Sequence, residues 1–209
     1  MEFVSQALAG FTAMSYWEYL AVLFGVGYIV FAMKESLWAW PCAFFNTLIY
    51  MVLFWNGALL MESALNFYYL LMAFYGFYCW KNTSVSTNEN QSLPITSWSM
   101  SKHLTIIGVT ALVSLILGYV MDNYTHADFP YLDTATSCFA VVTTYLVAKK
   151  VLENWLYWVV IDAVSIYLFL AKGYYPTVVL FIIYTGLAVA GYFTWRNHYQ
   201  GQYQLAHTH

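Results

Sequence analysis

The sequence predicts an all-α integral membrane protein with seven transmembrane helices, arranged as two parallel three-helix repeats joined by a linker helix. Three observations lead to this prediction: the composition, the number of long apolar segments, and an internal repeat. Of the 209 residues, 62% are hydrophobic and only 8% are charged, whereas a soluble domain typically carries about 25% charged residues. So little charge cannot cover a water-facing surface, which places the chain in a lipid bilayer.

A membrane helix needs about 20 mainly apolar residues, and seven segments of the chain meet this requirement. They lie at residues 16–33, 38–56, 61–80, 103–121, 131–148, 154–171 and 175–195. We expect the first three to form a bundle within residues 1–80 and the last three to form another within 131–196. Residues 81–121 are then a polar loop and the linker helix, and residues 197–209 a short polar cytoplasmic tail.

The basic residues are distributed unevenly between the two sides of this arrangement. Six of the seven fall on the side that holds the first, third and fifth connections and the C-terminus: Lys34, Lys81, Lys102, Lys149, Lys150 and Arg196. Only Lys172 falls on the other side. Because cytoplasmic loops carry the excess of Lys and Arg, we expect the N-terminus outside and the C-terminus in the cytoplasm, and we interpret Lys149–Lys150 as part of this signal.

Two stretches of the chain, Ser36–Asn82 and Glu153–Asn197, echo each other. Each opens with paired tryptophans, carries one polar residue about two turns later (Asn46 and Asp162), and closes with Gly-x-x-x-Trp, a basic residue and Asn. One span lies between the copies, so both copies start on the same side and form parallel repeats. In transporters built this way the substrate site lies near the middle of the membrane, where the halves meet.

Polar residues inside the spans are the candidates for this site. An Asp or Arg at the centre of a membrane helix costs on the order of 2.5–3.5 kcal/mol, so an ionisable residue there is a functional hypothesis by default. Helical spacing places several polar and aromatic side chains on shared faces. The predicted substrate-binding residues are Asn46 and Tyr50 on the second span, Glu62, Asn66 and Tyr69 on the third, Trp155, Trp158 and Asp162 on the sixth, and Tyr184 on the seventh.

A cage of this composition suits a flat, cationic, heteroaromatic molecule, because aromatic faces and carboxylates both attract cations. The alternative for the Asn and Tyr residues is hydrogen bonding between helices. The five histidines lie at span ends or in the tail, so the chain lacks a paired catalytic motif inside the membrane and we expect no enzyme activity, no metal and no cofactor. A net charge of −3 without a basic tract indicates no nucleic-acid partner.

Three motifs resemble the PnuC family of bacterial vitamin transporters: "FPYLDTATSC" (129–138), "KKVLENWLYWVVI" (149–161) and "YGFYCW" (75–80). The resemblance implies a three-plus-one-plus-three fold, like a full-length relative of the SWEET sugar transporters. It also implies facilitated diffusion across the bacterial inner membrane, trapping of the vitamin by a cytoplasmic kinase, and a homotrimer.

The departures from the family pattern suggest the substrate. The nicotinamide riboside branch typically has a carboxamide where this chain has Asp162, and Glu62-x-x-x-Asn66-x-x-Tyr69 looks like the thiamine branch, called PnuT. We therefore expect thiamine, with Trp158 stacked on one ring and Glu62 and Asn66 holding the aminopyrimidine. Nicotinamide riboside, which is also cationic, and riboflavin are the alternatives within the family. The alternative class is a vitamin-binding subunit of an energised transporter.

Overall fold

The computed structural model describes residues 2–57, 60–82, 93–125 and 129–207, and within these ranges it contains eight α-helices. They are α1 (Glu2–Ala13), α2 (Tyr16–Met33), α3 (Ala39–Asn56), α4 (Leu60–Asn82), α5 (Met100–Tyr124), α6 (Pro130–Ala148), α7 (Asn154–Ala171) and α8 (Tyr175–His207). The seven helices from α2 to α8 coincide with the seven predicted segments, apart from a few residues at their ends and the longer α8. Four of them, α2, α5, α7 and residues 175–202 of α8, are long and apolar enough to cross a membrane by length and composition.

Two parts of the chain differ from the prediction. Helix α1 was not predicted, because its 12 residues are too few for a membrane span and carry no long apolar run. Helix α8 continues to His207, so the residues predicted as a short polar tail are helical up to that residue. Its sequence after Trp195 contains Arg, Gln and Leu, which are good helix formers, and no proline. Residues 83–92 of the predicted polar loop lie outside the described residues.

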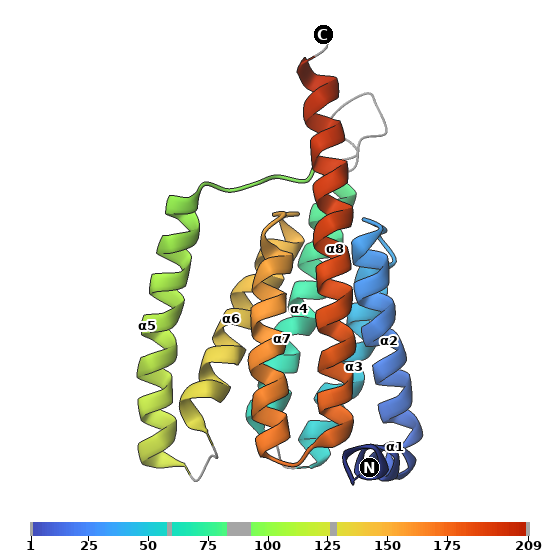
Figure 1. Ribbon diagram of the computed structural model, residues 1–209, viewed down its shortest axis with the longest axis vertical. Coiled ribbons are helices and arrows are strands. Elements are labelled where there is room, and N and C mark those ends of the chain that lie inside the picture. Colours follow the sequence, from blue (N-terminus) through green and yellow to red (C-terminus); the bar gives the residue numbers. More distant parts are fainter. Residues whose placement is uncertain (1, 58–59, 83–92, 126–128, 208–209) are drawn as a thin grey trace.

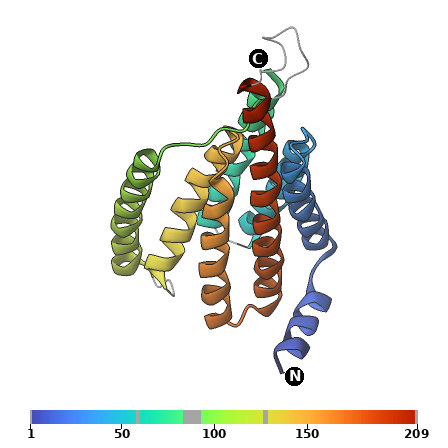
Figure 2. The ribbon, with the colours of Figure 1, turned by 45° about the horizontal axis from the view of Figure 1, so that its top comes forward.

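The helices pack side by side, with α5 outlying at one side (Figure 1); for description, α2–α4 are called here the first group and α6–α8 the second. Within the first group α3 packs against both α2 and α4, and within the second α7 packs against both α6 and α8. The two groups meet where α4 packs on α6 and where α2 packs on α8. Helix α5 stands at one side of the bundle and packs on α6, while α1 lies against α8 at the end opposite the C-terminus (Figures 1 and 2).

The second group repeats the first at a constant distance of 115 positions. Helix α7 begins and ends 115 residues after α3, and α8 begins 115 residues after α4. The turns repeat as well: the Ser36 N–H donates to the Phe31 carbonyl at 2.9 Å, and the Val151 N–H donates to the Leu146 carbonyl at 3.0 Å. At this distance the counterpart of Asp162 is Thr47, so pairing Asp162 with Asn46 was wrong by one residue.

Four tryptophans pack together at the C-terminal end of the bundle. Trp40 packs edge-on against Trp80, with 5.2 Å between ring centroids, and Trp155 packs edge-on against Trp195 at 5.4 Å. Trp80 and Trp195 join the two pairs at 6.3 Å. Trp40 and Trp155 each pack against a glycine, and this close packing leaves no room for a side chain there. A Cβ on Gly76 would lie 2.0 Å from the Trp40 ring, and a Cβ on Gly191 would lie 2.6 Å from the Trp155 ring.

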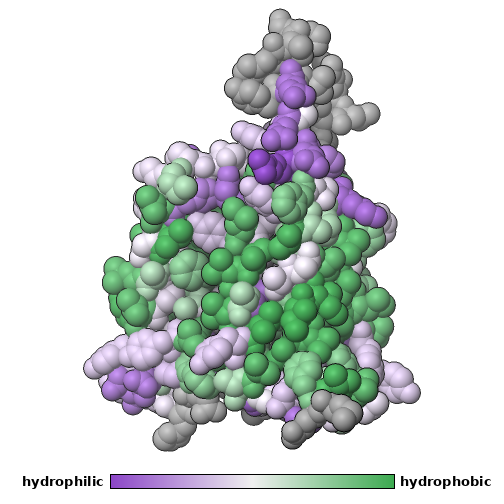
Figure 3. Space-filling model, viewed as in Figure 1, coloured by the Kyte–Doolittle hydropathy of each residue, from purple (hydrophilic) through white to green (hydrophobic). Residues whose placement is uncertain are grey.

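The outer surface of the bundle is apolar in its middle. Figure 3 shows hydrophobic residues across the middle of the face seen in Figure 1, and hydrophilic residues around the C-terminal part of α8. Large exposed hydrophobic side chains occur on each of the helices α2 to α8, among them Leu23, Leu115 and Phe193. An apolar surface of this extent is typical of contact with lipid, which agrees with the composition.

Candidate substrate site

Two predicted site residues meet on a glycine of α2. The Asn46 side-chain amide on α3 donates to the Ala21 carbonyl of α2 at 2.7 Å. A Cβ on Gly25 would lie 3.0 Å from the Asn46 Nδ2 and 2.7 Å from the Tyr184 hydroxyl on α8. The glycine therefore lets a carboxamide of the first helix group and a phenol of the second approach the same point of α2.

Two more predicted residues lie within electrostatic range of this point. Tyr50 on α3 and Asp162 on α7 both interact electrostatically with the Tyr184 hydroxyl. The Tyr50 ring stacks on Phe54, with 5.6 Å between centroids and an interplanar angle of 16°. Asn46, Tyr50, Asp162 and Tyr184 are called here the interior cluster; they come from α3, α7 and α8.

Asp162 is the most unusual member of the interior cluster. It is 4% exposed and lies about halfway along α7. Its carboxylate forms no hydrogen bond or ion pair with the residues that the structure describes. Burying a carboxylate without a partner is costly, so a cationic ligand is the natural complement to this group.

The predicted residues of α4 are placed differently. The Asn66 side-chain amide donates to the Glu62 backbone carbonyl at 2.8 Å, and the Glu62 side chain is exposed. Asn side chains readily bond the backbone of their own helix in this way. Tyr69 packs against Tyr68, whose hydroxyl donates to the Val141 carbonyl of α6 at 3.0 Å. The Asn66 amide is therefore engaged by its own helix, and the pairing of Glu62 with Asn66 around an aminopyrimidine stays a prediction.

Trp155 belongs to the hydrophobic core and not to the interior cluster. It is 3% exposed and packs on Gly191 and Trp195, as its counterpart Trp40 packs on Gly76 and Trp80. Helical spacing predicts that Trp155 and Asp162 share a face of α7, but it does not identify what packs on each part of that face. Trp158 is partly buried and also packs against the tryptophan core.

The Glu-Asn-Trp stretch has a second structural role that the sequence did not indicate. The Glu153 carboxylate accepts hydrogen bonds from the Ser97 hydroxyl and from the Trp98 N–H. Thr96 forms a short parallel bridge with Val151, since its N–H donates to the Lys150 carbonyl at 2.9 Å and its carbonyl accepts from the Leu152 N–H at 2.8 Å. These bonds fasten the segment before α5 to the start of α7.

Lys150 was interpreted only as an orientation signal, but it is buried. Its exposed fraction is 0%, and its ammonium forms an ion pair with Glu35 at 2.7 Å. Burial lowers the pKa of Lys150, while the hydrogen bond to Glu35 opposes this shift. The signal that could have identified the pair is the repeat, because Glu35 and Lys150 occupy equivalent positions 115 residues apart.

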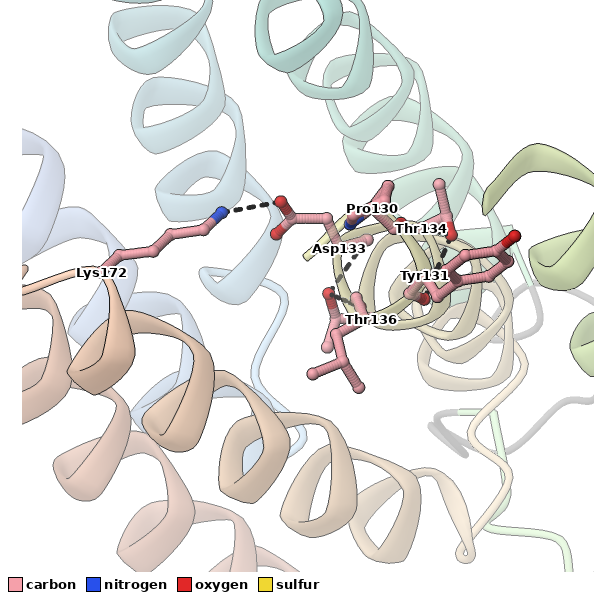
Figure 4. A network of polar contacts seen from close by, with 7 residues as sticks. Pro130, Tyr131, Asp133, Thr134, Thr136 and Lys172 are labelled. Atoms are coloured by element: carbon pink, nitrogen blue, oxygen red, sulfur yellow. Dashed lines mark hydrogen bonds and ion pairs between the residues drawn. The ribbon is translucent and has the colours of Figure 1, made fainter. Parts of the chain in front are cut away.

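A second ion pair lies at the opposite end of the bundle (Figure 4). The Lys172 ammonium, after α7, lies 2.7 Å from the Asp133 carboxylate in the first turn of α6. Nearby on α6, the Thr134 hydroxyl lies 3.1 Å from the Ser114 carbonyl of α5, which fastens the outlying helix to the second group. Asp133 therefore links the first turn of α6 to the turn after α7.

Comparison with known proteins gives consistent matches over most of the chain. The profile of the family described as "Nicotinamide mononucleotide transporter" matches residues 15–197. The chain is 25% identical over 214 residues to "Nicotinamide riboside transporter PnuC" of Escherichia coli (strain K12), covering 90% of this chain and 88% of that protein. It is 23% identical over 175 residues to "Riboflavin/roseoflavin transporter RibM" of Streptomyces davaonensis, covering 83% and 81%.

A solved structure has the same fold. "Crystal structure of the Vitamin B3 transporter PnuC" matches with a TM-score of 0.74 and 19% sequence identity, covering 95% of this chain and 88% of that chain. At this identity the likeness concerns the fold alone.

Proposed function

Because this chain belongs to the family described as "Nicotinamide mononucleotide transporter", we propose that it carries a cationic vitamin across the membrane, with nicotinamide riboside as the first candidate. The chain is a multi-pass membrane transporter of the PnuC family and not an enzyme. The observation that supports the substrate best is the match to a nicotinamide riboside transporter over 90% of this chain.

The interior cluster has the chemistry that this substrate requires. Nicotinamide riboside combines a cationic pyridinium ring with a carboxamide and ribose hydroxyls. Tyr50 and Tyr184 offer aromatic faces to the cation, and Asp162 offers an opposite charge in a buried setting. Asn46 and the tyrosine hydroxyls can exchange hydrogen bonds with the carboxamide or the ribose.

Thiamine is the second candidate. Asp162 favours it, because a nicotinamide riboside transporter was expected to have a carboxamide at this position and this chain has a buried carboxylate. The expectation that thiamine is the first substrate gains no support from the relatives named above, which transport nicotinamide riboside or riboflavin and roseoflavin. Riboflavin ranks third, because it is neutral and leaves Asp162 uncompensated.

The proposed mechanism is alternating access between two parallel three-helix halves, α2–α4 and α6–α8, joined by the linker helix α5. The constant repeat of 115 positions and the matched contacts of α4 with α6 and of α2 with α8 support this arrangement. Rocking of the halves would expose the interior cluster to each side in turn. The proposal includes an outside N-terminus, a cytoplasmic C-terminus, location in the bacterial inner membrane, a homotrimer and trapping by a cytoplasmic kinase.

Binding of three vitamins to the purified protein tests the substrate. Titration calorimetry in detergent should give the lowest dissociation constant for nicotinamide riboside, a higher one for thiamine, and the highest for riboflavin. Tighter binding of thiamine would reverse the order of the first two candidates. Binding of riboflavin alone would overturn the proposal of a cationic substrate.

A further inference from the structure

A cavity lies beside α1, the helix at the end of the bundle opposite the C-terminus (Figure 2). Its volume is about 540 Å³, within the roughly 300–1,000 Å³ typical of ligand sites. Its walls come from α1, the start of α2, and the turn between α7 and α8. The lining includes Gln6, Gly10, Glu18, Tyr174 and Tyr175. Since α2 and α8 belong to different helix groups, the cavity lies over one of the contacts between the groups.

The cavity contains one fixed negative charge. Glu18 is the only charged residue among the described residues that line it. One of its carboxylate oxygens accepts from the Ser15 N–H at 2.6 Å and from the Ser15 hydroxyl at 2.7 Å, as part of a capping box. The N-terminus of α2 carries a partial positive charge of about half a unit, which offsets only part of the negative charge of Glu18. The cavity therefore remains negative. Lys172 lies close in sequence, but its ammonium is paired with Asp133.

The cavity also has aromatic walls. Two tyrosines, Tyr174 and Tyr175, line the cavity wall, and Tyr175 is held edge-on against Phe3 of α1 at 5.4 Å. A carboxylate beside aromatic rings is the combination that recognises organic cations.

We propose that this cavity is an entry vestibule that binds the cationic vitamin before it reaches the interior cluster, with Glu18 as the residue that selects for positive charge. The inference rests on the proposed function, because it requires a cationic substrate. It adds a binding site outside the interior cluster and assigns a role to α1, which forms one wall.

The test compares a cation with its neutral reduced form in liposome uptake. Gln at position 18 can keep the capping box, so Glu18→Gln removes the charge and preserves the start of α2. We expect the KM for nicotinamide riboside to rise about three- to tenfold, because electrostatic attraction is lost. The maximal rate should stay unchanged, and so should the KM for neutral dihydronicotinamide riboside.

Two further variants test the charge of the cavity without changing residue 18, in case Glu18→Gln disturbs the start of α2. Gln6→Lys places a positive charge on the cavity wall without touching the capping box, and should raise the KM for the cation in the same way. Asp122→Asn removes a carboxylate from the exposed C-terminal end of α5 and should behave as the native chain.

The possible failures can be told apart. If Glu18→Gln and Gln6→Lys leave the KM for the cation unchanged, or change both substrate forms equally, the vestibule is overturned and the transport proposal still stands. If the native chain takes up no cationic vitamin, the proposed function is overturned and the vestibule falls with it.

Discussion

The Glu35 carboxylate and the Lys150 ammonium form a buried ion pair, 2.7 Å apart, between equivalent turns of the two helix groups. Glu35 follows α2 and Lys150 follows α6, and both have left-handed backbone, with φ of 53° and 49°. The other Glu35 oxygen lies 2.7 Å from His198 Nδ1 of α8, and the Lys150 ammonium lies 4.7 Å from the centre of the Trp80 ring. The pair joins the groups at the C-terminal end of the bundle.

Replacing Lys150 by Met tests the contribution of this pair. Met keeps an apolar stem near Trp80 but leaves Glu35 without its main partner, so we expect a loss of about 3 kcal/mol of stability, since removing one partner of a buried pair costs several kcal/mol. Unfolding in detergent measures the loss. The double variant Lys150→Met/Glu35→Gln should cost clearly less than the sum of the single variants; additive costs would mean that the pair does not act as a unit.

Replacing Gly25 by Ala should damage the interior cluster. The added Cβ would lie 2.7 Å from the Tyr184 hydroxyl and 3.0 Å from the Asn46 Nδ2, so both side chains must move. We expect the dissociation constant for nicotinamide riboside to rise about tenfold, equal to 1.4 kcal/mol. Gly27→Ala on the same helix is the control, because its Cβ would come no closer than 3.4 Å to the Cys42 sulfur. Equal affinities of the two variants would exclude Gly25 from the site.

Replacing Gly191 by Ala should destabilise the tryptophan core. The new Cβ would lie 2.6 Å from the Trp155 ring, and overpacking of this kind typically costs about 1–3 kcal/mol. Gly186→Ala on the same helix meets nothing within 4 Å and should keep or slightly raise the melting temperature, since Ala favours helix over Gly. A melting temperature of Gly191→Ala as high as that of Gly186→Ala would contradict the packing described for Trp155.

Replacing Asp162 by Asn separates binding from stability. Removing a buried charge that forms no hydrogen bond or ion pair within the described part of the chain should leave stability unchanged or increase it. Affinity for a cationic vitamin should fall about tenfold or more, because the opposite charge is lost. Calorimetry and thermal unfolding of one preparation measure both quantities. A variant that binds nicotinamide riboside more tightly would assign Asp162 to a different substrate, with thiamine the next to test.

The positions of the helices followed from the sequence because apolar runs of membrane length leave little ambiguity. Helix α7 was predicted at 154–171 and is found there. The repeat was also visible, since the Gly-x-x-x-Trp segments recur at Gly76 and Gly191. Helix α1 was missed because a short helix that packs on another element, as Gly10 does on Pro176, carries no strong signal of its own.

Helical spacing predicts which residues share a face but not which neighbour packs on that face. Trp155 was predicted to bind the substrate, and it packs into the core. Whether Asn46, Tyr50, Asp162 and Tyr184 bind the substrate stays a prediction. Gly25 could not be identified, since a glycine in an apolar span has no chemistry to mark it. Its role depends on two side chains from other helices, which only the folded structure brings together.

The most direct test of the account is uptake of labelled nicotinamide riboside into liposomes that contain only this protein. We predict uptake that saturates, needs no ATP or ion gradient, and stops when the internal and external concentrations are equal. The Asp162→Asn variant should raise its KM. An absence of uptake while the purified protein still binds the vitamin would contradict the account, and would identify the chain as a binding subunit that needs an energised partner.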